Sequence, residues 1–336
     1  TIVRMMRMIG EIVCPSVILL GEVVMEPVKV VPYFGSIDKP ECHLLYNVTT
    51  MCTTWHTVAT RNTRLLRRQL DAVNALPKEY VFLNYLRCHD DIGWGLDYAW
   101  LHRTFGTDEV LHKRYLNDYF QGFVGNSTSR GELYNDDMTS GDARLCGTTA
   151  SLCGIEKAGF EQDHWAMERA VQFDLTLHAM MLMQTGIPML YSGDELAQTN
   201  DYSYKEDPQK ADDSRYLHRG RLRWEQSEHI HDLETPEGKV FCGLNALVAL
   251  RGISPAFGTG ADVWTLDTSD DGLLAVGRYA KGQKIIGVFN FTEWEKTVTF
   301  IHDPGEFVDM LTGETHLLLD LVISAYSFYY LEQRNE

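Results

Sequence analysis

Three ionisable residues follow one another where an apolar stretch of the sequence ends. Residues 80–87 read YVFLNYLR, and His89, Asp90 and Asp91 come directly after Cys88. Adjacent carboxylates are tolerated at a strand end when they point to different faces, because successive side chains of a strand alternate. One carboxylate could then face a substrate while the other meets an arginine. The candidate arginines are Arg87, Arg144 and Arg215.

The same two carboxylates could instead have a purely structural role. A pair of aspartates also caps helices or binds arginines where no chemistry takes place. The local sequence leaves both interpretations of Asp90 and Asp91 open.

A third carboxylate, Glu22, ends another short apolar stretch, SVILLGE at residues 16–22. A carboxyl group at the mouth of an apolar strand tends to have a raised pKa, which suits a general acid. The alternative is a solvated loop carboxylate without a chemical role. Glu22 is therefore a candidate catalytic acid, with Asp90 as a second candidate catalytic carboxylate.

Two long polar segments contain the side chains that a sugar site needs. Residues 139–148 include Arg144, and residues 200–224 include Arg215 among several tyrosines and aspartates. Aromatic faces stack on the C–H surfaces of sugars, while carboxylates and arginine forks hold hydroxyl groups. Plain solvated loops of this composition would also be unremarkable, so the segments indicate a polyhydroxylated ligand without requiring one.

Alternating strands and helices must position these residues. Four short apolar runs predict strands that are buried on both faces: residues 16–22, 42–47, 80–87 and 189–195. Helices are predicted at residues 1–13, roughly 49–75 and 165–186. The second of these is expected to carry its basic residues on its outer face: Arg61, Arg64, Arg67 and Arg68. This alternation predicts a parallel α/β arrangement.

Polar residues follow every one of the four predicted strands. They are Glu22, Asn47, the His89-Asp90-Asp91 group, and Asp194 with Glu195. In a (β/α)8 barrel, functional groups gather at the carboxyl ends of the strands, although doubly wound sheets also bind ligands there. We therefore favour a (β/α)8 barrel over a doubly wound sheet for residues 1–255, with an insertion at about 93–160 that is too long for a simple connection.

The pattern of the sequence changes after about residue 260. Short alternating runs are separated by the turn sequences DDG, KGQ and DPG. Such runs are typical of antiparallel strands, so residues 256–336 are predicted to form a C-terminal β-sandwich domain.

Composition excludes several classes of function. The net charge is -17, from 47 acidic and 30 basic residues, so the surface would repel the phosphates of nucleic acid. Seven cysteines occur without a CxxC pair, which favours reduced thiols over disulfides or structural zinc. No apolar run is long enough for a membrane span. A cytoplasmic protein is therefore expected. No metal or cofactor is expected either, because phosphate-loop, HExxH, EF-hand and GxSxG motifs do not occur.

Four segments together resemble a known family. They are LLGEVVMEP, YLRCHDDIGW, TSGDARLCGTTASL and GIPMLYSGDELAQTNDYSYKEDPQKADDSRYLHR. They are similar to the second half of amylosucrases, which belong to glycoside hydrolase family 13, the α-amylase superfamily. The similarity runs through the whole chain, from about the fifth barrel strand onward. It implies the second half of a (β/α)8 barrel, with the insertion after strand 7 and a C-terminal β-sandwich.

The resemblance also implies a role for each candidate site residue. Glu22 matches the general acid/base, and Asp90 matches the carboxylate that stabilises the transition state. The other four residues match groups that bind the sugar: His89 in the glucosyl subsite, Asp91 and Arg144 on the acceptor or fructosyl side, and Arg215 at the bottom of the glucose pocket.

The implied reaction is retaining α-glucosyl transfer from sucrose. Glu22 would protonate the departing fructosyl oxygen, and an α-1,4-glucan would accept the glucosyl group. With water as acceptor, the enzyme would be a sucrose hydrolase or an α-glucosidase. A hypothesis of another class is a non-catalytic carbohydrate-binding fragment.

This chain departs from the family pattern over the whole N-terminal half, which in the family includes the nucleophile, its arginine and the partner of Arg215. The nucleophilic aspartate would lie in an Arg-x-Asp-Ala motif before the first helix, and TIVRMMRM contains no Asp. We therefore expect the first four strands and the nucleophile to belong to a missing N-terminal half. Half a barrel would have two apolar sheet edges, and the chain alone is expected to be inactive.

Overall fold

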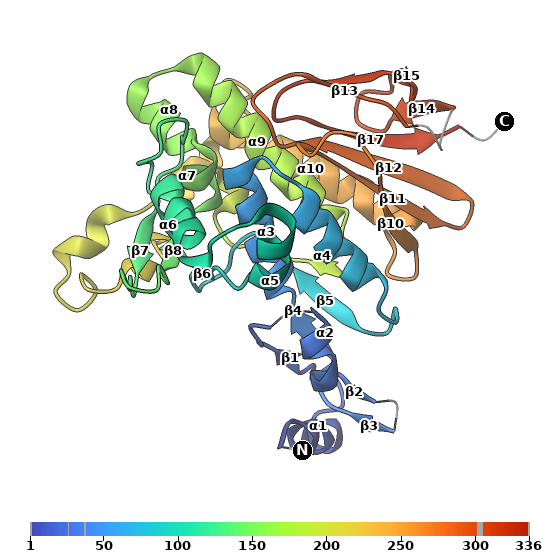
Figure 1. Cartoon of the computed structure of the whole chain (residues 1–336), viewed down its shortest axis with the longest axis horizontal. Helices are drawn as coiled ribbons and strands as arrows, with labels where there is room; N and C mark the ends of the chain where they lie inside the picture. Colours follow the sequence, from blue (N-terminus) through green and yellow to red (C-terminus); the bar gives the residue numbers. More distant parts are fainter. Residues whose placement is uncertain (1, 26, 37, 301–304, 335–336) are drawn as a thin grey trace.

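The computed structural model describes residues 2–25, 27–36, 38–300 and 305–334. Several of the candidate residues follow strands of one parallel sheet, and the strands β1, β4 and β5 of this sheet lie along the lower side of the body in Figure 1, toward the N-terminal segment. The strand order of the sheet is β1-β4-β5-β9, and every neighbouring pair is parallel. The strands are β1 (Leu20–Gly21), β4 (Leu44–Tyr46), β5 (Val81–Asn84) and β9 (Ile187–Pro188). The parallel α/β prediction is confirmed, and each strand is shorter than the apolar run that predicted it.

The fourth strand lies earlier than predicted. It begins at Ile187, and the N–H of Met189 still donates to the carbonyl of Asn84 at 2.8 Å. The prediction of a strand over 189–195 was wrong, because Gly193 adopts a left-handed φ of 98° and the 3-10 helix η2 (Asp194–Leu196) follows. Extended backbone cannot continue through such a conformation.

Two helices replace the single long helix predicted at 49–75. They are α3 (Val48–Thr60) and α4 (Arg64–Asn74). Arg61 ends α3 in the left-handed region, with φ of 55°. Its guanidinium donates to Tyr119 Oη at 2.8 Å and pairs with Glu293 at 3.2 Å. Arg61 is therefore turned inward, contrary to the expected outer basic face.

The predicted insertion is folded into helices and a small sheet. The helices are α5 (Tyr98–Phe105), α6 (Glu109–Phe120), α7 (Thr149–Cys153) and α8 (Ile155–Glu161). The antiparallel sheet β6-β8-β7 contains β6 (Ile92–Gly93), β8 (Arg144–Cys146) and β7 (Glu132–Tyr134). Its register places Arg144 opposite Gly93 on one side and Tyr134 on the other. The sheet thus returns a distant arginine to the segment that follows Asp91.

Two long helices and three short ones complete this part. The helices α9 (His164–Leu182) and α10 (Pro236–Ile253) pack against each other. Besides η2, the 3-10 helices between them are η3 (Tyr202–Glu206), η4 (Ser214–Leu217) and η5 (Trp224–His229). Trp55 of α3 is fully buried and donates to the carbonyl of Leu86 at 2.7 Å, which fixes α3 against the chain leaving β5.

The C-terminal part is an antiparallel sheet of six strands, in the order β10-β11-β12-β17-β14-β15. Its strands are β10 (Asp262–Leu266), β11 (Leu273–Ala280), β12 (Gln283–Asn290), β17 (Phe328–Gln333), β14 (Glu306–Asp309) and β15 (Thr315–Leu317). One face joins the main core, where Tyr330 donates to the carbonyl of Ala179 in α9 at 2.5 Å. The other face packs with the pair β13 (Lys296–Val298) and β16 (Leu321–Ile323). The antiparallel prediction is confirmed, and the boundary at 255/256 stays a prediction.

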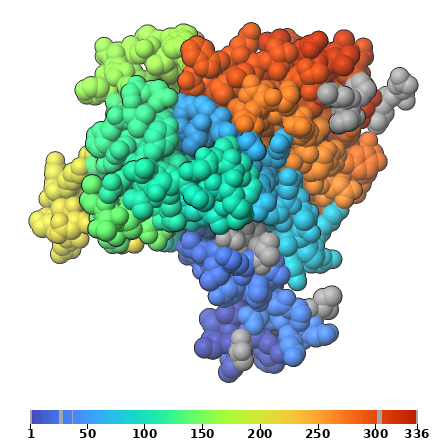
Figure 2. Space-filling view, viewed as in Figure 1, coloured from blue at the N-terminus to red at the C-terminus, as the bar shows by residue number. Residues whose placement is uncertain are grey.

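The N-terminal segment projects from the body of the molecule (Figures 1 and 2). It contains α1 (Ile2–Val13), the short α2 (Pro27–Val30), η1 (Val31–Tyr33), and the hairpin of β2 (Gly35–Ser36) and β3 (Lys39–Pro40). Helix α1 has no buried residue, and seven apolar side chains on it are exposed: Ile2, Met5, Met6, Met8, Ile9, Ile12 and Val13. In the described parts of the chain, no helix combines the length and apolarity that a bilayer crossing requires.

Candidate active site

Glu22 follows β1 directly, at the carboxyl end of the parallel sheet. Its negative charge contributes to raised pKa values of Tyr46, Tyr85 and Cys88, after the larger effect of burial on each. Glu22 therefore lies near the ends of β4 and β5. Its side chain is exposed, whereas the sequence analysis expected an apolar mouth. The reason is that β1 has only β4 as a neighbour within the described residues.

Two side chains of the 200–224 region contact the backbone of the segment that follows β5. Arg219 Nε donates to the carbonyl of His89 at 2.5 Å, and His218 Nε2 lies 3.4 Å from the same oxygen. Arg219 Nη2 also lies 3.2 Å from Asp90 Oδ1. The His89 side chain itself is exposed. Asp90 is thus oriented by a guanidinium and still has 39% of its side chain accessible.

Arg215 makes a two-point contact with the carboxylate two residues before it. Its Nε and Nη2 each lie 2.8 Å from an oxygen of Asp213, and this contact lowers the pKa of Asp213. The guanidinium also covers the ring of Tyr134 at 4.5 Å and reaches Asp90 Oδ1 at 3.7 Å. A bidentate contact fixes the plane of an arginine more firmly than a single ion pair does. Arg215 and Arg219 therefore approach Asp90 together.

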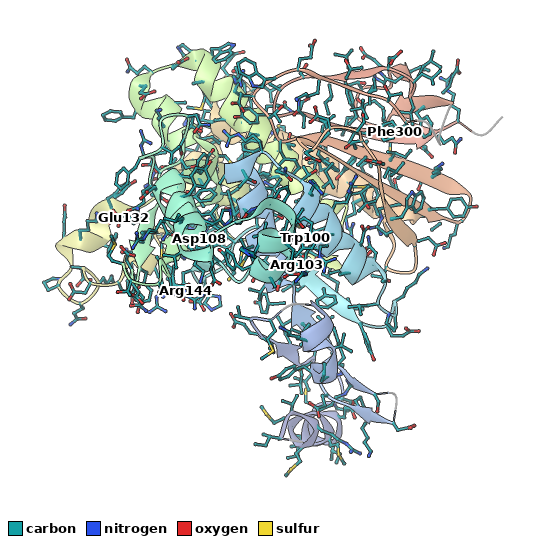
Figure 3. All side chains as sticks on the ribbon, viewed as in Figure 1. Trp100, Arg103, Asp108, Glu132, Arg144 and Phe300 are labelled. Carbon is teal, nitrogen blue, oxygen red and sulfur yellow. The ribbon has the colours of Figure 1, made fainter. Side chains whose placement is uncertain are left out.

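Asp91 and Arg144 form a second pair of neighbouring charges, next to Asp90 and its two arginines. Burial raises the pKa of Asp91, and the positive charge of Arg144 opposes that rise. A Cβ added to Gly93 would lie 1.9 Å from Arg144 Nη1, so the guanidinium rests on the bare Cα of Gly93. Arg144 is exposed and forms no ion pair with another described residue. Figure 3 labels Arg144 at the rim of the molecule, on the same side as Glu132.

Arg87 does not join this group, although the sequence made it a candidate partner. Its Nε donates to Asp194 Oδ1 at 2.7 Å, and both side chains are 2% exposed. His178 of α9 lies between Asp194 and Asp174, and its pKa is raised by Asp174 against the opposing effect of burial. Asp194 is therefore a structural carboxylate beneath the site.

A second strand-end residue also proves structural. Asn47 Nδ2 donates to Asn84 Oδ1 at 2.8 Å, and both amides are buried. Asn84 in turn donates to the carbonyl of Thr185, which precedes β9. The two amides therefore connect the end of β4 with β5 and with the start of β9. Because the Asn47 side chain is buried in this network, we assign it a structural role.

Sequence reasoning missed three residues of the site: Tyr134, Asp213 and Arg219. Asp213 could have been found, because its spacing of two from Arg215 allows a local bidentate contact. Arg219 stands 129 residues from Asp90, and nothing in the sequence indicates that pairing. Tyr134 reaches Arg215 only through the fold of the insertion.

Sequence comparisons connect the chain to phosphorylases of glucosides. No family model matches the sequence. The chain is 25% identical over 260 residues to a glucosylglycerate phosphorylase of Spirochaeta thermophila, a match that covers 76% of this chain and 40% of the relative. It is 24% identical over 326 residues to the glucosylglycerate phosphorylase of Escherichia coli, covering 94% of this chain and 54% of that enzyme. The chain therefore spans about half the length of the curated relatives it matches.

Solved structures share the fold over almost the whole chain. One is the α-amylase of Geobacillus thermoleovorans complexed with acarbose, with a TM-score of 0.59, 14% identity, and coverage of 99% of this chain and 57% of that one. Another is the sucrose 6F-phosphate phosphorylase of Thermoanaerobacter thermosaccharolyticum, with a TM-score of 0.62, 17% identity, and coverage of 94% and 53%. The chain thus has the fold of roughly half of an α-amylase-type enzyme, and its sequence is similar to that of glucosylglycerate phosphorylases.

Proposed function

We propose that this chain forms the acid/base side of a site for retaining α-glucosyl transfer. The observation that carries the proposal is that Glu22 and Asp90 both follow parallel strands and both add to the rise that burial causes in the pKa of the Cys88 thiol, with Asp90 contacted by Arg215 and Arg219. Carboxylates at this end of a (β/α)8 sheet are the groups that retaining glycosidases use. Similarity to phosphorylases of glucosides and to an α-amylase fold supports the same reaction class.

Each residue has a defined task in this proposal. Glu22 protonates the departing oxygen of the donor and later deprotonates the acceptor, while Asp90 stabilises the positive charge that develops on the glucosyl ring. His89 binds the same ring, and Arg215 forms the base of its pocket. Asp91 and Arg144 face the acceptor side. The two arginines that approach Asp90 keep its oxygens oriented before the substrate arrives, which avoids reorganisation during the reaction.

We further propose that additional parallel strands complete the sheet and supply the nucleophile. Two carboxylates at the strand ends, Glu22 and Asp90, already have tasks, and Asp194 is buried against Arg87. The edges of the sheet carry exposed apolar side chains, among them Ile18 and Leu20 at β1 and Ile187 at β9. Proteins protect unpaired apolar edges of this kind, and a barrel removes them altogether by closing the sheet with further strands. We call this chain together with the completing strands the assembled enzyme, whether they belong to the same polypeptide or to another.

The narrower assignment is glucosyl transfer from sucrose to an α-1,4-glucan with release of fructose, as in amylosucrases. A second candidate is phosphorolysis, with inorganic phosphate as acceptor. It is favoured by the names of the curated relatives and by the exposed guanidinium of Arg144, which forms no ion pair among the described residues, since arginine forks bind phosphate well. Hydrolysis differs only in the use of water as acceptor.

One product analysis separates these acceptors. The assembled enzyme is incubated with sucrose in three parallel reactions, with no addition, with a glucan primer and with inorganic phosphate. Amylosucrase-type transfer predicts fructose with elongated glucan, phosphorolysis predicts glucose 1-phosphate, and hydrolysis predicts equal free glucose and fructose. This chain alone is expected to give none of these products. Turnover by the chain alone would contradict the need for additional strands, and an inactive assembled enzyme would contradict the proposed function.

A further inference from the structure

A cavity lined by none of the residues of the candidate active site lies where the insertion and helix α9 meet loops of the C-terminal part. Its volume is about 430 Å3, which falls within the roughly 300–1,000 Å3 typical of small-molecule sites. The residues named at the candidate active site do not line it. The cavity is therefore a separate feature that glucosyl transfer does not explain.

Two exposed tryptophans stand at this cavity. Trp165 is 68% exposed and Trp294 is 67% exposed, and both line the cavity wall. Neither indole N–H donates a hydrogen bond to any other residue that the structure describes. Single exposed aromatic residues are common on protein surfaces, but two that line one cavity indicate a ligand that covers aromatic faces.

The wall behind the tryptophans is held in place by arginines. The guanidinium of Arg169 lies 4.4 Å from the ring centre of Trp165 and 5.1 Å from that of Tyr326. Arg169 also donates to the carbonyl of Glu293 at 3.0 Å, and Arg61 pairs with the Glu293 carboxylate at 3.2 Å. Side chains fixed in this way lose little further freedom when a ligand binds, so the cavity is preorganised.

The charged residues that line the cavity indicate which class of ligand it could bind. Its three basic residues are Arg61, Lys157 and Arg169, and its three acidic residues are Glu161, Asp163 and Glu293. Equal numbers of opposite charges disfavour a phosphorylated or anionic ligand. The polar side chains of Asn126 and Thr128 complete the wall. Aromatic faces beside amide, hydroxyl and carboxylate groups match the C–H faces and hydroxyls of a sugar.

We propose that this cavity is an accessory binding site for a neutral oligosaccharide. A sugar ring stacks on the free face of Trp165 or Trp294, and its hydroxyls bond to the polar groups of the wall. The site makes no use of Glu22 or Asp90 and does not depend on the proposed glucosyl transfer. Its ligand is held without being cleaved.

Calorimetric titration of the chain with maltotetraose and, in parallel, with cellotetraose tests this proposal. Trp294→Ala is the main variant, because the Trp294 ring makes no aromatic or cation–π contact with another described residue, whereas the Trp165 ring contacts Arg169, and Trp165→Ala is the second. Trp224→Ala is the matched control, since Trp224 is 72% exposed and lies outside the cavity. Arg215→Ala reports on binding at the candidate active site.

At least one sugar is expected to bind, and each cavity variant should weaken that binding by about tenfold relative to Trp224→Ala. Arg215→Ala should leave this component of binding unchanged. The proposal is overturned if neither sugar binds, or if both cavity variants bind within a factor of two of the control. It is also overturned if Arg215→Ala alone abolishes binding. None of these outcomes bears on turnover, so failure here is distinct from failure of the proposed reaction.

Discussion

Arg219 Nη2 lies 3.2 Å from Asp90 Oδ1, while Nε of the same guanidinium holds the carbonyl of His89 at 2.5 Å. One side chain therefore fixes both the backbone and the carboxylate of the segment that follows β5. The three adjacent ionisable residues do not end the strand itself, contrary to the prediction from the sequence, because β5 ends at Asn84 and they lie in the irregular segment that follows it. Asp90 contacts Arg215 and Arg219. Asp91 is instead half-buried, and the positive charge of Arg144 opposes the rise in its pKa that burial causes.

Removing the Arg219 side chain should impair the site without unfolding the protein. Arg219→Ala leaves Asp90 with only the longer 3.7 Å contact to Arg215. We expect kcat/KM of the assembled enzyme for sucrose to fall by about 10- to 100-fold, because a misplaced stabilising carboxylate loses transition-state binding. Steady-state kinetics measure this effect. Arg221→Ala is the control, since Arg221 is exposed and makes no ion pair within the described residues, and an equal loss in that variant would refute the role of Arg219.

A methyl group at Gly93 should disturb the acceptor side. In Gly93→Ala the new Cβ would lie only 1.9 Å from Arg144 Nη1, which is too close, so the flexible guanidinium of Arg144 would have to move. We expect a change in unfolding free energy below about 1 kcal/mol, since only the end of a long side chain shifts. The ratio of transfer to hydrolysis in the assembled enzyme should fall. Gly95→Ala, whose Cβ would meet only Val24 Cγ1 at an ordinary 3.9 Å, should keep that ratio. Unchanged acceptor use in Gly93→Ala would show that Arg144 does not serve the acceptor.

Protonation of His218 should destabilise the fold in acid. Burial and the nearby charge of Arg87 lower the pKa of His218 to about 3, below the ordinary value of 6.5. The unfolded chain therefore binds the proton more readily, and stability falls as pH decreases from about 6.5 toward 3.

His218→Gln removes this group and should reduce the loss of unfolding free energy between pH 7.5 and 4.5 by roughly 2 kcal/mol. Urea denaturation at the two pH values gives the comparison. The control is His231→Gln, which replaces an exposed imidazole and should show the same pH dependence as the unaltered chain. An equal pH dependence in His218→Gln would place the acid-sensitive group elsewhere.

The predictable parts of the fold are those that local sequence determines. The short apolar runs located the first three parallel strands, and the alternating runs after residue 260 located the antiparallel sheet. The break at Arg61 could not be predicted, because neither glycine nor proline occurs there. Arg61 reaches Glu293, 232 residues away, so a tertiary contact determines where α3 ends. Propensity alone would continue the helix.

The same distinction holds for the candidate site. Motifs identified Asp90 and Arg215, which the structure brings together, but not Arg219, which lies closer to Asp90. Arg87 was an equally plausible partner from the sequence, yet it is buried against Asp194. The Arg87 side chain points to Asp194 of η2, which lies beside His178 of α9. No short sequence pattern predicts this packing. Asp213 was within reach of sequence reasoning, whereas Arg219 was not.

The central claim is that Glu22 acts as the acid/base of glucosyl transfer, and a change of leaving group tests it directly. The assembled enzyme and its Glu22→Gln variant are compared with sucrose, whose leaving oxygen needs a proton, and with α-glucosyl fluoride, whose fluoride does not. General acid catalysis is typically worth about 10²–10⁴-fold. The variant should lose activity of that order with sucrose and should still release fluoride in the glucosylation step. Equal losses with both donors, or full sucrose activity in the variant, would contradict the role of Glu22.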